Sequence, residues 1–452
     1  MRYEDFIASK QFVMQSAGFD ADLENYPLFD YQQAIVTWAC HRGRAAIFAD
    51  TGLGKTIMQL AWADQVSKQT GGNVLVLAPL AVSEQTINEG KKFGIDVRRA
   101  DCITSPGIYI TNYEQLHNVD PSDFDGVVLD ESSILKGMQG KIRAQITESF
   151  KNTPYRLSCT ATPSPNDFME LGTQAEFLGI MSQVEMLAMF FVHDGSDTSK
   201  WRLRGHGRKK FFEWLSTWAV FISKPSDIGF ENKGHDLPEL ILKEHIVESG
   251  ERDGLFAPVA QGLLDRNKAR KNSVDARVAK AAEIASMSDG QLLVWCHLNE
   301  ESEKLTKAID GAVEVKGSDT AYHKASSMMG FSVGSVPVLI SKPKIAGFGM
   351  NWQQCNQMIF VGLSDSWEQF YQAIRRCWRF GQTRTVTVHI ICADTEGAVL
   401  ENIRRKEQQQ QRLKAEMIEI MRDKTLEALG MASNEKTEYI TIEKMEIPTW
   451  AA

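Results

Sequence analysis

The sequence predicts an α/β protein with two parallel-sheet domains in tandem, a mostly helical insert between them and a helix at the C-terminal end. Short continuous apolar runs alternate with amphipathic segments over residues 45–129 and again over 291–391. Such runs are typical of strands buried on both faces of a parallel sheet. The alternation pauses over 167–235, where Phe, Trp and Met residues surround a basic cluster, and residues 401–429 are mostly polar without Pro or Gly. Two α/β halves around a helical insert are the simplest account of this order.

The apolar runs also set the expected strands and domain limits. Strands are expected at 45–48, 74–78, 108–110, 126–129, 291–296, 336–340, 358–361 and 386–391. The predicted domains are an N-terminal helical segment at 1–27, a first α/β domain at 28–166, the insert at 167–245, a second α/β domain at 246–400, and a C-terminal helix with its tail at 401–452. A chain of 452 residues suits two or three domains, since one domain holds about 150 residues.

Composition excludes several classes of protein. The hydrophobic content of 43% and charged content of 24% are those of a globular protein. The net charge of −8 excludes a protein that coats nucleic acid by bulk charge, so any such contact needs a local basic surface. Seven cysteines without zinc-type spacing predict reduced thiols. The acidic start and the short apolar run at 186–192 predict no secretory signal and no membrane span, so we expect a cytoplasmic protein.

A glycine-rich loop follows the first apolar run. Residues 49–56 read Ala-Asp-Thr-Gly-Leu-Gly-Lys-Thr, between a predicted strand and a predicted helix. Such a loop turns several backbone N–H groups toward one point, where they and the helix dipole hold phosphate. We expect ATP with Mg²⁺ here, with Lys55 reaching the β- and γ-phosphates and Thr56 ligating the metal. The residues expected to bind the nucleotide are Thr51, Gly52, Leu53, Gly54, Lys55 and Thr56.

Two acids follow the apolar run at 126–129. Charges placed after an apolar strand emerge at the C-terminal edge of an open α/β sheet, where ligands bind. We expect Asp130 to ligate Mg²⁺ and Glu131 to orient and deprotonate the attacking water. Upstream of the loop, Gln32 can present a donor and an acceptor to an adenine edge. The hydroxyls of residues 158–162 stand where they could link the acids to a moving second domain.

In this order, the blocks at 31–32, 52–56, 130–133 and 160–163 resemble the first half of a superfamily two helicase. Residues 161–171 are similar to a signature of the Swi/Snf-type translocases, and residues 346–351 and 372–382 resemble their fifth and sixth motifs. The resemblance covers most of residues 28–385 and implies two RecA-like domains that hydrolyse ATP.

The sequence departs from the family pattern at several positions. Ser132 and Ser133 stand where DEAH-type enzymes have Ala-His, and Ala49 and Arg375 replace residues that are often Gly and Asp in relatives. The length resembles short phage-encoded DEAD/DEAH-type helicases more than the large eukaryotic remodellers.

Two arginines of the sixth block are expected to complete the nucleotide site. Arg376 and Arg379 are one helical turn apart, so both guanidinium groups project from one helix face. A planar, permanently charged fork suits a γ-phosphate in its transition state. By the resemblance, both approach nucleotide bound to the first half, and Arg379 is the expected finger. The alternative is a basic helix face on the surface.

The insert carries the expected nucleic-acid contact. Its cations are Arg202, Arg204, Arg208, Lys209 and Lys210. They could neutralise phosphates, with a strong dependence on salt. Phe211, Trp214 and Trp218 lie at i, i+3 and i+7, a spacing typical of a core-facing helix, so we expect them in the core. A second cluster at 268–271 is expected to be a solvated helix face.

The predicted function is an ATP-dependent DNA helicase or double-stranded DNA translocase. Since no sequence-reading module is visible, contacts with duplex or branched DNA should be mainly to the backbone and weakly sequence-specific. Replication or recombination proteins are candidate partners. Two alternatives remain open: an RNA-dependent ATPase or helicase, and an ATP-gated clamp that holds DNA without moving along it.

Overall fold

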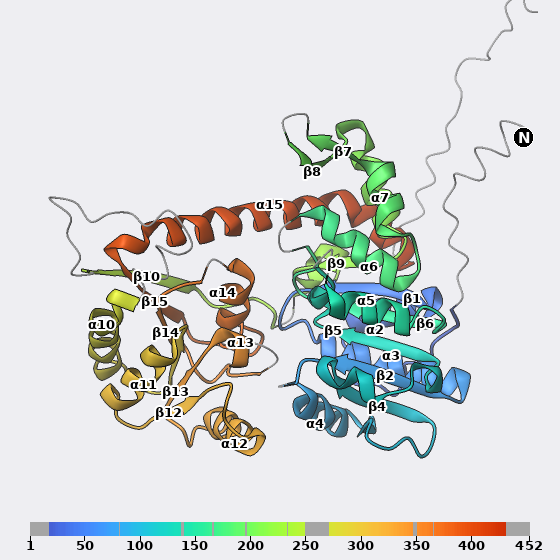
Figure 1. Cartoon of the computed structure of the whole chain (residues 1–452). Helices are drawn as coiled ribbons and strands as arrows, with labels where there is room; N and C mark the ends of the chain where they lie inside the picture. Colours follow the sequence, from blue (N-terminus) through green and yellow to red (C-terminus); the bar gives the residue numbers. More distant parts are fainter. Residues whose placement is uncertain are drawn as a thin grey trace, which may run out of the picture.

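The computed structural model describes residues 18–80, 82–136, 140–164, 167–194, 197–232, 234–248, 271–346, 350–364 and 366–430. These residues form two α/β lobes that lie side by side, with one long helix running across both (Figure 1). Residues 1–17 and 431–452, which include most of the expected N-terminal helical segment and the C-terminal tail, lie outside the described residues. Residues 18–29 contain a turn and no helix, which corrects the expectation for that part of the segment.

Lobe 1 is built on a seven-stranded sheet with the order β3-β4-β2-β5-β6-β1-β9. Its strands are β1 (Arg44–Ala49), β2 (Asn73–Ala78), β3 (Val97–Arg99), β4 (Gly107–Asn112), β5 (Gly126–Asp130), β6 (Tyr155–Cys159) and β9 (Ala219–Ile222). All neighbouring pairs are parallel. The four strands predicted for the first half are confirmed, and β5 ends at Asp130 as expected.

Lobe 2 is built on a six-stranded sheet with the order β10-β15-β14-β11-β13-β12. Its strands are β10 (Leu240–Val247), β11 (Leu292–Cys296), β12 (Ala312–Val315), β13 (Val338–Ser341), β14 (Gln357–Val361) and β15 (Val386–Ala393). These pairs are also all parallel. The four predicted strands are again confirmed, and together the two sheets fit two RecA-like domains.

Helices cover the sheets and connect the strands. In lobe 1 they are α2 (Asp30–Arg42), α3 (Lys55–Thr70), α4 (Ser83–Phe93), α5 (Lys141–Ser149) and α6 (Leu171–Leu178), with 3-10 turns η1 (Tyr113–Asn118), η2 (Pro121–Asp123), η3 (Ser132–Lys136), η4 (Phe168–Glu170) and η6 (Pro225–Ile228). In lobe 2 they are α10 (Val274–Ser286), α11 (Asn299–Ala308), α12 (Ala321–Ser332), α13 (Pro343–Ala346) and α14 (Trp367–Ile374), with η7 (Asp394–Glu396). The last helix, α15 (Gly397–Ala428), starts in lobe 2 and ends on lobe 1 (Figure 1).

The range expected to be a helical insert, 167–245, is more varied than we expected. It contains helices α7 (Gln183–Phe190) and α8 (Arg208–Ser216), but also an antiparallel hairpin of β7 (Phe191–Asp194) and β8 (Asp197–Leu203), and the turn η5 (Gly205–Gly207). It also supplies β9 to the first sheet and most of β10 to the second, so both sheets extend further along the chain than the apolar runs indicated.

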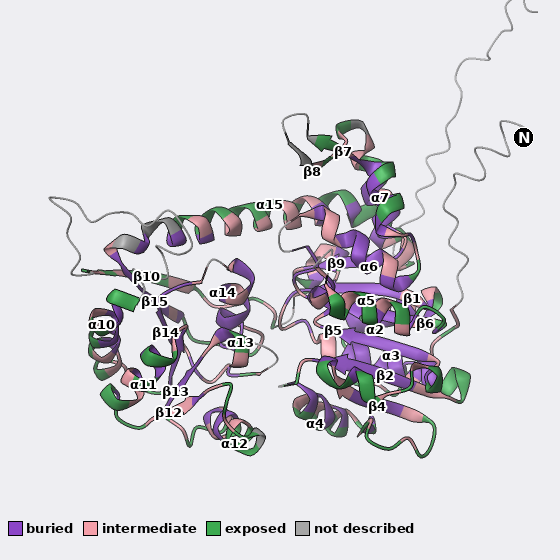
Figure 2. Cartoon of the chain, in the orientation of Figure 1, coloured by how far each residue is buried: buried purple, intermediate pink, exposed green. Residues whose placement is uncertain are grey.

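The core is apolar on both faces of each sheet, which explains the uninterrupted apolar runs. The strands of both sheets are mostly buried, whereas α15 is largely half-buried or exposed along its middle (Figure 2). Phe211, Trp214 and Trp218 are buried among Phe190 and Phe191, so the prediction that they belong to the core is confirmed.

Three buried charged side chains connect α10, α11 and the start of α15 in lobe 2. The Arg277 guanidinium on α10 lies 2.6 Å from Glu301 Oε1 on α11 and 3.9 Å from Glu396 Oε2, just before α15. All three side chains are essentially inaccessible to water. Removing one partner of a buried pair leaves an uncompensated charge, which costs more than the pair itself contributes.

We therefore expect Arg277→Ala to lower the free energy of unfolding of lobe 2 by about 3–5 kcal/mol, because Glu301 and Glu396 lose their shared cation in the interior. Urea denaturation followed by tryptophan fluorescence measures this change. Lys280→Ala is the matched control on the same helix, since Lys280 pairs with Glu283 at the surface and should change stability by at most about 0.5 kcal/mol. Equal stability of the two variants would contradict the role given to Arg277.

Candidate functional site

The glycine-rich loop lies between the end of β1 and the start of α3, at the carboxyl edge of the first sheet. Gly52 and Gly54 have φ angles of +93° and +74°, in the region that favours glycine. A Cβ on Gly54 would lie 2.3 Å from Gln32 Nε2, and one on Gly52 would lie 2.9 Å from the backbone N of Phe380 in lobe 2. Both conformation and contact therefore require glycine at these positions.

Lys55 lies inside the loop and points back along it. Its Nζ donates to the carbonyl oxygens of Ala49, at 2.9 Å, and Asp50, at 3.4 Å. Burial lowers the pKa of Lys55, and the nearby charges of Glu131, Asp50 and Asp130 oppose that shift. Lys55 is thus a buried cation under the influence of three carboxylates, inside the loop that would hold an anion.

Gln32 and Tyr31, at the start of α2, form hydrogen bonds with the glycine-rich loop. Gln32 Nε2 and the Tyr31 hydroxyl both donate to the carbonyl oxygen of Leu53, at 3.0 and 2.9 Å. Gln32 Oε1 accepts from the backbone N of Phe29, so both ends of the amide are occupied here by backbone groups. The role of Gln32 at an adenine edge stays a prediction, and it would require the amide to exchange these partners.

A cluster of aromatic side chains packs around Tyr31, next to these hydrogen bonds. Phe29 and Tyr31 lie near His235 from the chain that links the lobes, with ring centroids 5.6 and 5.4 Å away. Phe380 of lobe 2 packs on the same imidazole at 4.7 Å. The cluster reaches the loop at Gly52, where an added Cβ would meet the backbone N and the Cβ of Phe380. Aromatic side chains of this kind suit a planar base.

Asp130 ends β5 and is buried beside α3. Gln59 Nε2 donates to Asp130 Oδ1 at 2.8 Å, and the Tyr113 hydroxyl donates to the Asp130 carbonyl oxygen at 2.6 Å. Burial, together with the negative charge of Glu131, raises the pKa of Asp130 to about 6. Two adjacent acids in a buried position favour the arrival of a cation.

Glu131 is held in an unusual backbone conformation. With φ +54°, it is the only non-glycine residue with positive φ among the described residues. Such a conformation costs about 1 kcal/mol or more and is typical of positions where a side chain must be aimed. Here it turns the Glu131 carboxylate toward β6, where the Thr160 hydroxyl lies 3.2 Å from its Oε2.

A chain of polar contacts leads from Glu131 into lobe 2. Thr160 Oγ1 also accepts from the backbone N of Thr162 at 3.1 Å, and the Thr162 hydroxyl lies 3.2 Å from Glu368 Oε1 at the start of α14. Glu368 in turn pairs with Lys136 of η3. The hydroxyls of this segment thus link the acids to the second lobe in the structure, as the sequence suggested.

Three arginines follow α14 and lie at the seam between the lobes. Since α14 ends at Ile374, Arg376 and Arg379 lie in turns and not on one helix face, which corrects that expectation. Arg376 donates to the carbonyl oxygens of Gln372 and Met350, and Arg379 donates to that of Met350. Burial lowers the pKa of Arg379 to about 10, and the adjacent charge of Arg376 adds to the shift. Arg376 is buried within the fields of Glu131 and Asp130. The guanidinium groups are therefore held largely out of water, where they act most strongly on an anion.

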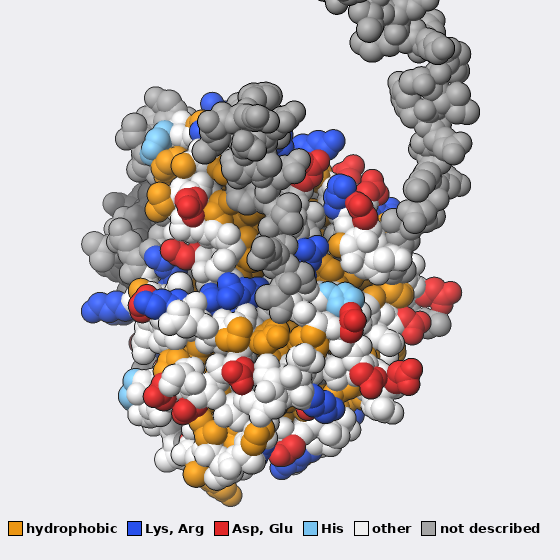
Figure 3. All heavy atoms as spheres, turned by 90° about the vertical axis from the view of Figure 1, so that its right-hand side faces the viewer, with side chains coloured by type: hydrophobic (Ala, Val, Ile, Leu, Met, Phe, Trp, Pro, Cys, Tyr) orange, Lys and Arg blue, Asp and Glu red, His pale blue; other side chains and the backbone are white. Residues whose placement is uncertain are grey.

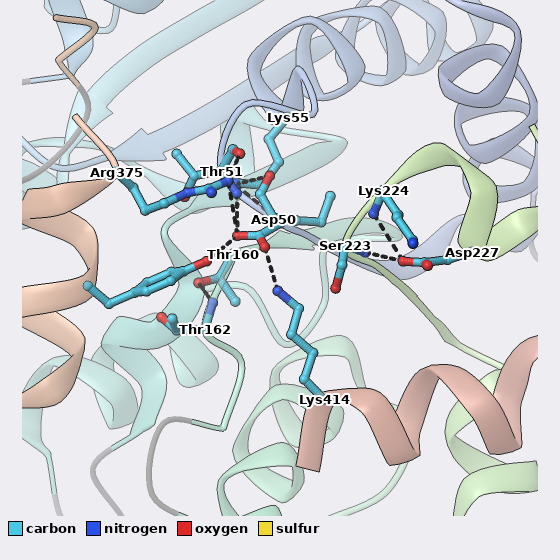
Figure 4. A network of polar contacts seen from close by, with 12 residues as sticks. Asp50, Thr51, Lys55, Thr160, Thr162, Ser223, Lys224, Asp227, Arg375 and Lys414 are labelled. Carbon is cyan, nitrogen blue, oxygen red and sulfur yellow. Dashed lines mark hydrogen bonds and ion pairs between the residues drawn. The ribbon is translucent and has the colours of Figure 1, made fainter. Parts of the chain in front are cut away.

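Arg375 contacts the glycine-rich loop directly. Its guanidinium donates to the Thr51 carbonyl oxygen and lies 3.6 Å from Asp50 Oδ1. Asp50 also accepts from the Tyr371 hydroxyl at 2.6 Å and from Lys414 Nζ of α15 at 2.6 Å (Figure 4). Burial alone would raise the pKa of Asp50, but Lys414 and Arg375 hold it well below its ordinary value. Through these contacts, Asp50 connects the glycine-rich loop with α14 and α15.

A cleft of about 1370 Å³ opens between the lobes on the side of α4 and α12. Lobe 1 contributes Leu80 after β2 and Asn112 at the end of β4, and lobe 2 contributes residues of α12 and α13. Glu131, Lys136 and Glu368 reach its wall, so the polar chain described above ends in this cleft.

The structure does not bring the basic cluster of the insert to this site. Arg204 donates to the carbonyl oxygens of Phe191 and Ala188, and Arg208 pairs with Glu416 of α15, so both have structural partners. Arg202, Lys209 and Lys210 are exposed. The face of lobe 1 in Figure 3 carries acidic and basic side chains interspersed. A DNA contact by this cluster stays a prediction, carried by its exposed members alone.

Several residues of the site gave no signal in the sequence. The structure brings Gln32, residues 51–56, Asp130, Glu131, Arg376 and Arg379 together around one seam. It adds Asp50, Tyr371, Glu368, Lys136 and Lys414, none of which we assigned to the site. The fifth block's residues 347–349 and residues 165–166 of the signature lie outside the described residues, as does most of the second cluster at 268–271.

The residues present fit a nucleoside triphosphate and a divalent cation. Two glycines leave room for backbone N–H groups to approach phosphate, and Lys55 has only carbonyl partners that a phosphate could replace. Within the described residues, no three His, Cys, Asp or Glu side chains form a preformed metal site. A Mg²⁺ ion held by Thr56 and Asp130 would therefore need phosphate oxygens to complete its shell, as Mg²⁺ sites at nucleotides do.

Comparison with known proteins gave matches to two family models and to solved structures. Residues 25–165 match the family model of the type III restriction enzyme res subunit, and residues 276–381 match the helicase conserved C-terminal domain. No curated protein matches the chain. Among solved structures, the "Sulfolobus solfataricus SWI2/SNF2 ATPase core in complex with dsDNA" matches with 18% identity and a TM-score of 0.40, over 84% of this chain and 89% of that chain. None of the described helices combines the length and apolar character needed to cross a bilayer.

Proposed function

We propose that this chain, which belongs to the superfamily two helicases, is an ATP-dependent motor that moves along duplex DNA. The observation that carries the proposal is the polar chain from Glu131 through Thr160 and Thr162 to Glu368 and Lys136. It connects the acid expected to activate water with the wall of a cleft between the lobes. A motor needs such a connection, because hydrolysis at one site must respond to the polymer held at another.

Each side chain of the site has a role in this proposal. Lys55 and the backbone of the loop hold the phosphates, and Thr56 and Asp130 hold Mg²⁺, which stabilises the charge that develops on the transferred phosphate. Glu131 accepts the proton of the attacking water, and Arg376 and Arg379 stabilise the phosphate's charge from lobe 2. Because these groups come from both lobes, nucleotide binding and release change the distance between the lobes.

The cleft beside α4 and α12 is the proposed path of the polymer. Its wall carries Lys136, whose side chain is 41% exposed, while the side chain of its partner Glu368 is 8% exposed. A backbone phosphate that attracts Lys136 would release Glu368, and Glu368 would then draw more strongly on Thr162. Contacts of this kind are to the backbone, so they predict weak sequence specificity and a strong dependence on salt. Duplex DNA is proposed rather than RNA because the motifs at 161–171 and 372–382 resemble those of Swi/Snf-type translocases.

Stimulation of ATP hydrolysis by different polymers tests the proposal. We expect a low rate for the protein alone and an increase of several-fold with duplex DNA, compared with single-stranded DNA and RNA at equal salt. A higher rate of hydrolysis with RNA than with DNA would identify RNA as the substrate. Equal rates with and without any polymer would contradict the proposal that the protein is a motor. Displacement of the third strand from a DNA triplex then separates a motor from a clamp, since a clamp leaves the triplex intact.

Arg379→Ala tests the proposed transition-state contact. We expect affinity for ATP within a few-fold of the parent and a loss of hydrolysis of at least about a hundredfold, since arginine fingers contribute about 10³–10⁵ in rate. Arg379→Lys should restore little, because an ammonium lacks the planar fork. Arg384→Ala is the control, since Arg384 is exposed and donates to the Gln354 carbonyl oxygen nearby. A rate near the parent's for Arg379→Ala would leave Arg376 as the finger.

Thr162→Val tests the polar chain without touching the acid. The substitution keeps the shape of the side chain and removes the hydroxyl that contacts Glu368. We expect the DNA-stimulated rate to fall by about tenfold, roughly the effect of one hydrogen bond in a coupled network, while nucleotide binding is retained. Thr173→Val is the matched control, because the buried Thr173 hydroxyl donates to the Glu170 carbonyl oxygen within lobe 1. Equal stimulation of both variants would contradict the connection.

A further inference from the structure

Helix α15 contributes a side chain to the nucleotide site, although it lies outside both sheets. Its first turns are rooted in lobe 2, where Val399, Leu400 and Ile403 join the core. Its later turns are seated on lobe 1, where Met417 and Met421 join the core. Between these two ends the helix passes the seam, and Gln410 Nε2 donates to the Ser164 carbonyl oxygen at 3.2 Å.

Lys414 projects from this middle part of α15 onto the loop. Its Nζ lies 2.6 Å from Asp50 Oδ2, one residue after the end of β1 (Figure 4). The Asp50 side chain is 12% exposed and that of Lys414 is 31% exposed. A carboxylate at this position is unfavourable for a phosphate-binding loop, because it repels the anion that the loop must accept. Lys414 and Arg375 are the cations that offset it.

The contact is arranged so that it can be broken. A cavity of about 740 Å³ adjoins Lys414 between α15 and the segment that follows β9, and its wall includes Lys224 and Asp227. Lys224 and Asp227 interact with each other at the start of η6 (Figure 4). The lysine therefore has room to leave Asp50 when α15 shifts, whereas Arg375 and Tyr371 are packed into α14 and move only with lobe 2.

We propose that Lys414 is a positioning residue of the nucleotide site: by neutralising Asp50 it sets the affinity of the loop for phosphate, and it makes that affinity depend on whether α15 is seated on lobe 1. The inference rests on the proposed function, because it concerns the same nucleotide. It extends that function by making α15 a regulatory part of the motor. Displacement of α15 by a partner or by lobe movement would then weaken nucleotide binding.

Titration with a fluorescent N-methylanthraniloyl ATP in the presence of Mg²⁺ tests the inference. We expect Lys414→Ala to raise the dissociation constant by about tenfold, the size expected for a close charge pair partly shielded from water. In steady-state assays with saturating DNA, KM for ATP should rise by a similar factor while kcat stays within about twofold. Lys414→Arg should restore most of the affinity, because a guanidinium also pairs with a carboxylate.

A double-mutant cycle identifies the route of the effect. If Lys414 acts through Asp50, the cost of Lys414→Ala disappears in an Asp50→Asn background. Lys424→Ala is the control on the same helix, since Lys424 pairs only with Glu427 near its end in the described structure, and it should bind like the parent. Melting temperatures of all variants establish that they are folded.

The outcomes separate this inference from the proposed function. Parent-like affinity of Lys414→Ala overturns the inference and leaves the proposed function standing. An equal cost in the Asp50→Asn background also overturns it, because Lys414 would then contact the nucleotide directly. A folded parent that binds no nucleotide overturns the proposed function and this inference together.

Discussion

Burial of charged side chains between the two lobes is the constraint on which the rest of the structure depends. Each of the buried apolar clusters lies within one lobe, and three of them also include residues of α15. Apart from the aromatic contacts of Phe380 with Phe29 and His235, apolar packing therefore does not fix how the lobes meet. Charged groups do: Asp50 pairs with Arg375 and Lys414, and Glu368 pairs with Lys136. A buried charge without a partner is costly, so the lobes settle where these pairs are complete. A highly charged ligand can change how the lobes are placed relative to each other, because it offers new ionic partners to several of these charged groups at once.

The fold could be predicted from the sequence because parallel sheets leave a strong pattern. A strand buried on both faces needs an uninterrupted apolar run, and all eight runs are strands of the two sheets. Strands β3, β6 and β12 were missed because charged or polar residues interrupt them. Strand β9 was missed because its apolar residues lie in the range expected to be a helical insert. Strand β10 was missed for a different reason: it is an edge strand with exposed Leu242 and Ile246, and the polar residues 243–245 interrupt its apolar ones.

The candidate site was predictable where one local segment carries the chemistry, as in residues 51–56 and in Asp130 and Glu131. It was not predictable where partners come from distant parts of the chain. Asp50 lies within the glycine-rich loop, but its role depends on contacts with Tyr371 and Lys414. Both are more than 300 residues away in the sequence, so the sequence alone did not indicate these contacts. Arg375 was recognised as a departure from the family pattern, and the structure gives the departure a physical reason, since an arginine here meets the acid at Asp50.

Helix α15 also changes the kinds of movement that are open to the lobes. With 32 residues it is about 48 Å long, and a helix of that length resists stretching. The lobes are therefore joined twice, by the covalent segment between β9 and β10 and by a stiff strut anchored in both cores. While α15 is seated on lobe 1, these two attachments limit how far the lobes can separate or twist relative to each other. The fold would then restrict the direction in which the cleft opens, and binding or release of the nucleotide would determine when it opens.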